Sequence, residues 1–210
     1  MLRLGSALAL VVLSGCPSSA GDSAPPCLPP FAVFTDIDET LTTLDQEWID
    51  QIGDPSYDPA MRSGAADLMQ GYASRGYSIF YVTARGEDIA LSDGRSAREA
   101  SEDWLLDHGF PFRDGALYLA EGMGAHGDSA VAYKSEVIVE LAAEGWEPSW
   151  AYGNADSDIL AFQDAGIPDD HIFLVGELAG TMGVQPIPDD QAYESHLAEQ
   201  LGQVTEAVCP

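Results

Sequence analysis

The sequence predicts an α/β fold, a doubly wound, Rossmann-like and mainly parallel sheet with helices on both faces. Short apolar runs alternate with segments of helical spacing along most of the 210 residues. These runs are nearly continuous in apolar residues, as expected for strands that are buried on both faces. Glycine follows several of the helical segments and marks their ends. A chain of this length has room for one domain with a full core, and it shows no internal repeat.

In the first half of the chain, FAVFTD (31–36) predicts a strand. Residues 60–74 carry apolar side chains at helical spacing and predict a helix. YSIFYVT (77–83) predicts the second strand, and residues 96–108 a second helix that ends at Gly109. Alternation of this kind implies parallel strands joined by right-handed crossovers.

The second half continues the alternation. The apolar runs 116–120, 149–153 and 171–176 predict three further strands. The helical segments that separate or follow these strands are 133–144, 157–165 and 192–204. Asp156 is expected to be the N-cap of the helix over 157–165. Residues 31–210 therefore form the predicted domain.

The composition is strongly acidic, with 8 Lys and Arg against 35 Asp and Glu. A surface this negative repels nucleic acid, and no polybasic segment is present to bind anionic lipid headgroups. An anionic substrate would therefore need a locally positive site. Lys134 is the only lysine in the sequence, so its position carries more information than that of a typical lysine.

The first residues have the composition of an export signal. A basic start is followed by the apolar stretch 4–13, which is too short to span a bilayer. The following LSGC (13–16) resembles the lipobox of bacterial lipoprotein signal peptides. This resemblance implies cleavage after residue 15, acylation of Cys16 and a protein that is exported and anchored to a membrane of the bacterial cell envelope. The alternative is an ordinary secretory signal that is cleaved elsewhere.

Residues 16–30 are rich in proline and serine and are predicted to be a tether between the anchor and the domain. Export would place Cys27 and Cys209 in a compartment that permits disulfides. We therefore predict that these two cysteines pair, with two free thiols as the alternative.

Polar residues follow the first, second and fourth predicted strands. In a doubly wound sheet, ligands bind at the carboxyl ends of the strands, near the point where the strand order reverses. We therefore expect these residues to meet in one site, together with the lysine at a predicted helix start. Taken alone, the first pair of aspartates could be a solvated turn. The candidate residues are Asp36, Asp38, Thr83, Arg85, Lys134, Asn154 and Asp158.

These motifs resemble the signature of the haloacid dehalogenase (HAD) superfamily of phosphatases. DIDET (36–40), Thr83, Lys134 and GNADSD (153–158) occur in the order that this signature requires. Within the superfamily, YVTARG and GNADSDILAFQDAGIP are most similar to the lipin-type domain, although Glu39 stands where that group has glycine. Secreted lipoprotein acid phosphatases share the DxDET motif but usually carry aspartate at the position of Asn154.

The resemblance implies a role for each candidate residue. Asp36 would be the nucleophile and Asp38 the general acid and base. Thr83 and Lys134 would bind the phosphate. Arg85 would either bind substrate or pair with acidic neighbours. The cofactor would be Mg²⁺. Its expected ligands are Asp36, Asp38, Asn154 and Asp158.

The expected function is Mg²⁺-dependent hydrolysis of a phosphomonoester. Residues 42–77, with one predicted helix, are too few for a large cap domain, so the site is expected to be open. An open site suits a bulky or membrane-borne ester, and the lipin-type resemblance suggests phosphatidate. One alternative is a secreted lipoprotein acid phosphatase that acts on soluble nucleotides. Another is a non-catalytic module that binds phospholipid.

Overall fold

The computed structural model describes residues 30–187 and 193–206. The predicted signal peptide and all but the last residue of the tether lie outside these residues. So do Cys16, Cys27 and Cys209, and the expected lipidation and disulfide stay predictions. No helix among the described residues is long and apolar enough to cross a membrane.

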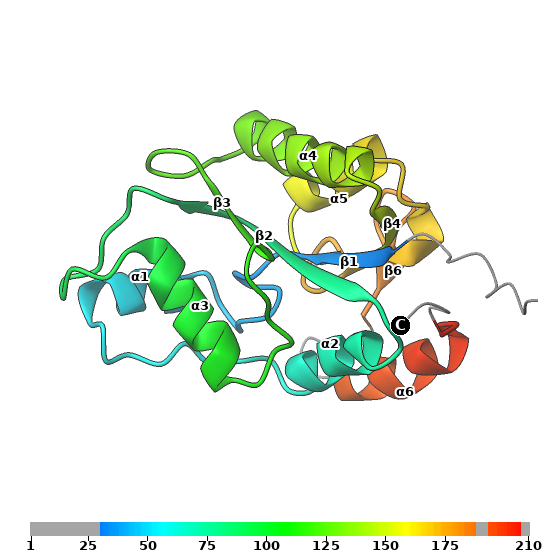
Figure 1. Ribbon diagram of the computed structural model, residues 1–210, viewed down its shortest axis with the longest axis horizontal. Helices are drawn as coiled ribbons and strands as arrows, with labels where there is room; N and C mark the ends of the chain where they lie inside the picture. Colours follow the sequence, from blue (N-terminus) through cyan, green and yellow to red (C-terminus); the bar gives the residue numbers. More distant parts are fainter. Residues whose placement is uncertain (1–29, 188–192, 207–210) are drawn as a thin grey trace, which may run out of the picture.

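Six parallel strands form one sheet in the order β3-β2-β1-β4-β5-β6, which confirms the predicted fold class (Figure 1). The chain runs outward from β1 to β3, then returns to the other side of β1 with β4. The strand order therefore reverses between β1 and β4. The strands are β1 Phe31–Thr35, β2 Ser78–Gly86, β3 Leu117–Ala120, β4 Glu147–Gly153, β5 Ile172–Leu174 and β6 Gln185–Pro186.

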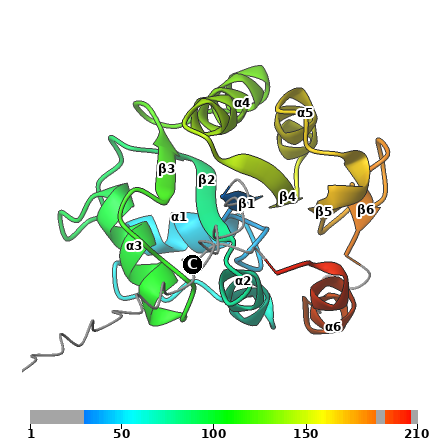
Figure 2. The same cartoon turned by 45° about the vertical axis from the view of Figure 1, so that its right-hand side comes forward.

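Helices cover both faces of the sheet, with α4 and α5 on one face and α2, α3 and α6 on the other (Figure 2). Successive side chains of a strand point to opposite faces. Val33 accordingly joins the core beneath α2 and α3, whereas Phe34 joins the core beneath α4 and α5. The helices are α1 Gln46–Gly53, α2 Ala65–Ala73, α3 Ala97–Asp107, α4 Asp128–Ala143, α5 Asp156–Asp164 and α6 Tyr193–Gln203, with a short 3₁₀ helix at Asp169–His171.

Several elements differ from the prediction. The helix α2 begins at Ala65, five residues after the predicted start, and the 3₁₀ helix was not predicted. The segment 42–77 holds two helices, α1 and α2, rather than one. The strand β6 was not predicted, because a two-residue strand leaves no periodic pattern. The helix α4 begins at Asp128, five residues before the predicted start, because its first turn carries small and polar residues that do not mark a buried face. Lys134 therefore lies in the second turn of α4 and not at the helix start.

A buried polar chain ties α6 to the rest of the domain. The hydroxyl of Tyr152 lies 2.8 Å from that of Tyr72 and 3.2 Å from Nε2 of His196. Gln200 Nε2 donates to the Tyr72 hydroxyl at 2.8 Å. Burial lowers the pKa of His196 to about 4, so the folded protein keeps this imidazole neutral in mild acid.

We expect His196 to contribute to acid unfolding. The pKa of His196 in the folded protein lies below the ordinary value of 6.5. Its contribution to the free energy of unfolding is therefore present above pH 6.5 and is lost as the pH falls toward 4. The loss should reach about 2 to 3 kcal/mol near pH 4.5. The variant His196→Gln has no imidazole to protonate, so its free energy of unfolding should not show this part of the loss.

Urea unfolding near pH 7.5 and near pH 4.5 measures the difference between the two proteins. The exposed His126 provides a matched control, because His126→Gln should follow the wild type at both pH values. If His196→Gln lost as much stability in acid as the wild type, the contribution of His196 would be disproved.

Candidate active site

Asp36 lies at the point where the strand order reverses. Its backbone N–H donates to the carbonyl of Tyr152 at 3.0 Å, which fixes it between β1 and β4. Its side chain is buried, and Oδ1 lies 3.0 Å from Nζ of Lys134. Burial raises the pKa of Asp36 to about 7, although Lys134 acts to lower it, and the carboxylates of Asp158 and Asp38 raise it further. The charged form of Asp36 thus needs more positive charge than Lys134 supplies.

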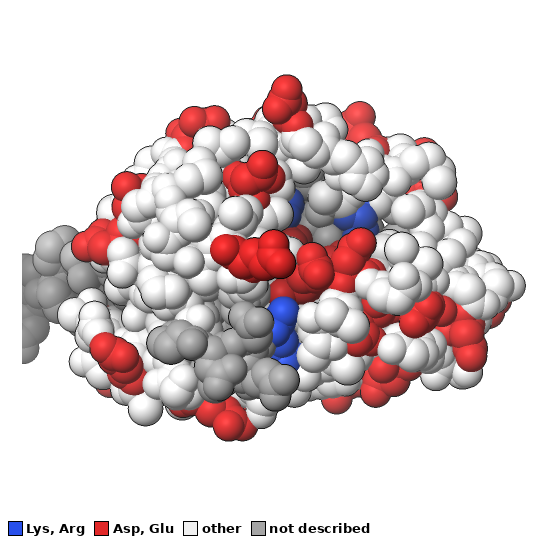
Figure 3. All heavy atoms as spheres, turned by 180° about the vertical axis from the view of Figure 1, so that it is seen from behind, with Lys and Arg blue, Asp and Glu red and all other residues white. Residues whose placement is uncertain are grey.

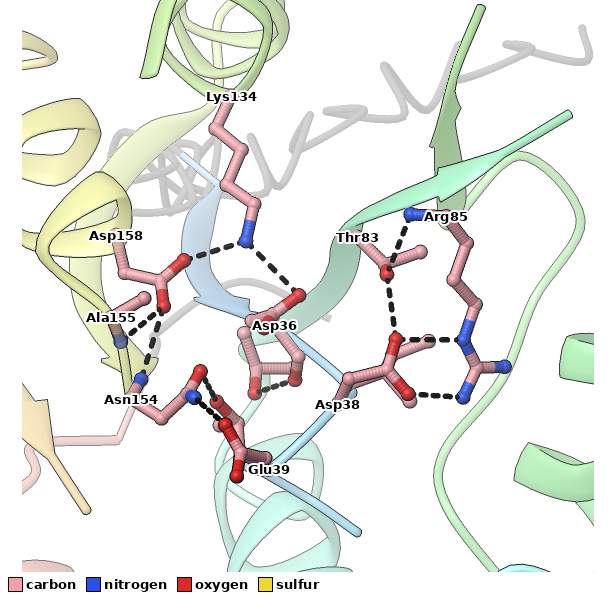
Figure 4. A network of polar contacts seen from close by, with 12 residues as sticks. Asp36, Asp38, Glu39, Thr83, Arg85, Lys134, Asn154, Ala155 and Asp158 are labelled. Atoms are coloured by element: carbon pink, nitrogen blue, oxygen red, sulfur yellow. Dashed lines mark hydrogen bonds and ion pairs between the residues drawn. The ribbon is translucent and has the colours of Figure 1, made fainter. Parts of the chain in front are cut away.

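Lys134 bridges two carboxylates. Its Nζ lies 2.6 Å from Oδ1 of Asp158 and 3.0 Å from Oδ1 of Asp36 (Figure 4). Burial alone would lower the pKa of Lys134, but the two carboxylates raise it above its ordinary value. This lysine therefore carries its charge throughout the physiological pH range.

Asp158 orients Lys134 and the turn that follows β4. Its second carboxylate oxygen, Oδ2, accepts hydrogen bonds from the backbone N–H groups of Asn154 and Ala155, both at 3.0 Å. The approach is possible because residue 153 is glycine: a Cβ on Gly153 would lie 2.5 Å from Cβ of Asp158. Both oxygens of this carboxylate are therefore engaged by protein groups.

The predicted N-cap at Asp156 is wrong by one residue. Ala155 occupies that position and Asp156 is the first residue of α5. Alanine offers no capping oxygen, and the start of α5 is held instead by Asp158, three residues after Ala155, which reaches back to accept from the backbone N–H groups of Asn154 and Ala155.

Asp38 faces Arg85. The guanidinium donates two hydrogen bonds to this carboxylate, from Nε at 2.9 Å and from Nη2 at 2.7 Å. The Thr83 hydroxyl lies 3.5 Å from Oδ2 of the same group and accepts a hydrogen bond from the backbone N–H of Arg85. Of the two roles left open for Arg85, the structure shows pairing with an acidic neighbour.

Glu39, to which the sequence assigned no role, holds Asn154 in place. Its Oε2 accepts from Nδ2 of Asn154 at 3.0 Å, while Oδ1 of Asn154 accepts from the Thr40 hydroxyl at 3.1 Å. The backbone of Glu39 has a φ of 54°, in the left-handed region that favours glycine. Arg62 stabilises this conformation by donating from Nε to the Glu39 carbonyl.

All of the candidate residues except Asp158, which lies behind Lys134, line a hollow of about 480 Å³ at the carboxyl edge of the sheet. One wall comes from α1 and contains Trp48, Ile49 and Ile52, and this wall was absent from the prediction. A larger hollow of about 1320 Å³ shares Glu39 and Asn154 with the first. Figure 3 shows one face of the molecule on which most of the charged side chains are acidic and few basic atoms are visible.

The donors around Asp36 fit a hard cation such as Mg²⁺. Among the described residues, no group of three or more His, Cys, Asp or Glu side chains could hold a metal ion by itself. The pocket instead mixes the Asp36 carboxylate with the amide oxygen of Asn154, and oxygen donors are those that Mg²⁺ prefers. Oδ1 of Asp36 is buried and accepts no hydrogen bond of good geometry. A cation near this atom would supply the missing positive charge.

Residues 33–176 match the family model of the LNS2 domain of PITM 1-3. The chain is 28% identical to protein retinal degeneration B of Drosophila melanogaster and 30% identical to membrane-associated phosphatidylinositol transfer protein 3 of Homo sapiens, each over 142 residues. Both alignments cover 67% of this chain but only 10% and 13% of those proteins, so the chain spans about a tenth of their length.

Two solved structures share the fold. A HAD-like phosphatase from Mesorhizobium loti is 22% identical, with a TM-score of 0.53 and coverage of 85% of this chain and 86% of its own. The D,D-heptose 1,7-bisphosphate phosphatase from B. bronchiseptica, solved with magnesium and phosphate, is 13% identical, with a TM-score of 0.54 and coverage of 80% and 98%. The predicted resemblance to HAD phosphatases and to the lipin-type domain is confirmed.

Proposed function

We propose a function from the premise that this chain belongs to the LNS2 domain family. Its fold is that of HAD phosphatases. On this basis the protein is a Mg²⁺-dependent phosphomonoester hydrolase that acts through an aspartyl-phosphate. The observation that carries the proposal is the position of Asp36, a buried carboxylate at the reversal of strand order that is paired with the only lysine of the sequence.

In the first half of the reaction, a carboxylate oxygen of Asp36 attacks phosphorus and the bond to the leaving oxygen breaks. Asp38 gives its proton to that oxygen. In the second half, Asp38 takes a proton from the water that attacks the phosphorus, which frees Asp36 and releases phosphate. The Thr83 hydroxyl and the Lys134 ammonium bind the phosphoryl oxygens and offset their charge.

The proposed ligands of Mg²⁺ are the Asp36 carboxylate, the backbone carbonyl of Asp38 and the amide oxygen of Asn154. When bound, the ion would neutralise the negative charge of the carboxylates and of the phosphate. Asp158 would contribute mainly through Lys134, or through a water molecule, because both of its oxygens already accept hydrogen bonds.

A lipid-linked or otherwise bulky phosphate ester is the proposed substrate, with phosphatidate as the first candidate. The human relative is named as a membrane-associated phosphatidylinositol transfer protein, which favours a lipid. The pocket has an apolar rim, where the side chains of Ile49 and Met123 are 53% and 73% exposed. An N-terminal lipid anchor at Cys16, which we also propose, would hold an exported enzyme beside such a substrate.

The deciding assay is phosphate release from p-nitrophenyl phosphate, from vesicles that contain phosphatidate and from soluble nucleotides. We expect release in the presence of Mg²⁺, a loss of about 100-fold or more in EDTA, and recovery when Mg²⁺ is returned in excess. Calcium in place of magnesium is the matched ion control, because its longer bonds and looser geometry suit the site less well.

Each outcome has a distinct meaning. Release from nucleotides alone would favour a soluble acid phosphatase. Binding to phosphatidate vesicles without any release of phosphate would identify a non-catalytic module. The name of the human relative, a phosphatidylinositol transfer protein, is a reason to test this alternative. Full activity in EDTA would disprove the role of the metal.

A further inference from the structure

We propose that Arg85 is a positioning residue that holds Asp38 in place for proton transfer and does not bind the phosphate. This inference rests on the proposed function. It starts from a bidentate ion pair in which both side chains are largely buried, with 1% of the Arg85 side chain and 16% of the Asp38 side chain exposed.

The hydrogen-bonding groups of Arg85 are mostly occupied. A guanidinium offers five N–H groups in a fixed plane. Nε and Nη2 donate to Asp38, and Nη1 donates to Oγ of Ser101 at 2.8 Å. Ser101 is itself fixed, because its hydroxyl donates to the carbonyl of Ala97 in α3 at 2.7 Å. Three of the five N–H groups are therefore engaged, and the buried position of the side chain restricts the access of a phosphate to the other two.

The flat face of the guanidinium is covered as well. Its central carbon lies 4.2 Å from the ring centroid of Trp48, which belongs to α1. A contact of this kind restricts the plane in which the guanidinium can lie. Arg85 is thus held by α1 on its face and by α3 at one edge, and it presents its other edge to Asp38.

This arrangement restrains the group that must move a proton. Asp38 lies in a loop after β1, and its contact with the Thr83 hydroxyl, at 3.5 Å, is long. Two parallel N–H···O bonds fix both the position and the plane of a carboxylate. When Asp38 acts as the acid it carries a proton from solvent on one oxygen, and the other oxygen still accepts from Arg85. As the bond from Asp36 to phosphorus forms and the bond to the leaving oxygen breaks, the O–H bond of Asp38 breaks and a new one forms on the leaving group. A displaced carboxyl group cannot reach that oxygen.

The dependence of the rate on the leaving group separates positioning of the acid from binding of phosphate. An alkyl phosphate needs a proton on its leaving oxygen, whereas dinitrophenolate leaves readily without one. The value of kcat/KM reports the first irreversible step, here the transfer of phosphoryl to Asp36. For Arg85→Met we expect kcat/KM to fall about 100-fold with an alkyl phosphate and by less than about 5-fold with dinitrophenyl phosphate. The inhibition constant of inorganic phosphate should stay unchanged.

Two further variants complete the test. Arg85→Lys keeps the charge but loses the bidentate geometry, so it should show the same selective loss, and it decides the question if Arg85→Met does not fold. Trp48→Ala should show a smaller loss of the same kind. The matched control is Arg75→Met, since Arg75 follows α2 at the opposite edge of the sheet and should leave both rates unchanged.

Equal losses on the two substrates, together with weaker inhibition by phosphate, would show that Arg85 binds the phosphoryl group and would overturn the inference alone. A wild type that is inactive on both substrates would instead overturn the proposed function, and the inference with it.

Discussion

Asp36→Asn is expected to abolish phosphate release, with a fall in kcat/KM of roughly 10⁴-fold or more. An amide is not a nucleophile toward phosphorus, and no other carboxylate takes its place beside Lys134 except Asp158, which is engaged by the turn after β4. The assay is phosphate release with Mg²⁺ on the preferred substrate. Asp128→Asn provides the matched control, because Asp128 is exposed at the start of α4 and outside the pocket.

The same substitution should not destabilise the protein. Burial raises the folded pKa of Asp36 to about 7, above its ordinary value of 3.8. The stability linked to its protonation is therefore present below pH 3.8 and is lost as the pH rises through 7. Asparagine stays neutral, so in EDTA at about pH 8 the Tm of Asp36→Asn should equal or exceed that of the wild type.

In the assay of phosphate release, activity of Asp36→Asn within tenfold of the wild type would disprove the role of Asp36 as nucleophile.

Lys134→Met is expected to remove activity and to destabilise the fold by about 3 to 5 kcal/mol. The lysine is buried between Asp36 and Asp158, and its loss leaves two buried carboxylates without their counter-charge. The free energy of unfolding, measured in urea at neutral pH and without metal, gives the size of the effect.

A double variant tests the cause of this instability. Adding Asp158→Asn to Lys134→Met should recover part of the lost free energy, because the amide oxygen still accepts from the backbone of Asn154 and Ala155 and carries no charge. Arg75→Met, which removes a partly exposed cation, should cost less than about 1 kcal/mol. A single Lys134 variant as stable as this control would contradict the bridging role.

The sequence predicted the grouping of the site because a parallel sheet brings the ends of its strands to one edge. The apolar runs of β1, β2 and β4 are clear in the sequence. Asp36 and Asn154 directly follow two of these strands and Thr83 lies near the carboxyl end of β2, so the fold class alone was enough to predict that they are neighbours. Gly153 was also identified from the sequence, as part of the motif GNADSD. The structural reason for a glycine there is the close approach of Asp158, which is visible only in the folded turn.

Other parts of the site depend on contacts that no local pattern encodes. The helix α1 has eight residues and buries Glu47 and Gln51 beside Trp48, so its inner face does not look apolar. The pairing of β2 with β3 shifts register between Thr83 and Gly86, and such an irregularity redirects the side chains that follow it. The direction of Arg85, and hence its pair with Asp38, could not be predicted from alternation along the strand.

The strand order also determines when the site can exist during folding. Phe31 of β1 pairs with Glu147 of β4, so this seam closes a loop that contains more than half of the chain. Closing so long a loop is entropically unfavourable, and contacts between distant segments form late in comparison with local ones. Until the seam closes, we expect Asp36 to keep part of its hydration, because Tyr152 of β4 and Asp158 after β4 complete its surroundings. The unfavourable free energy of burying the Asp36 carboxylate therefore arises in full only when the two halves of the sheet join.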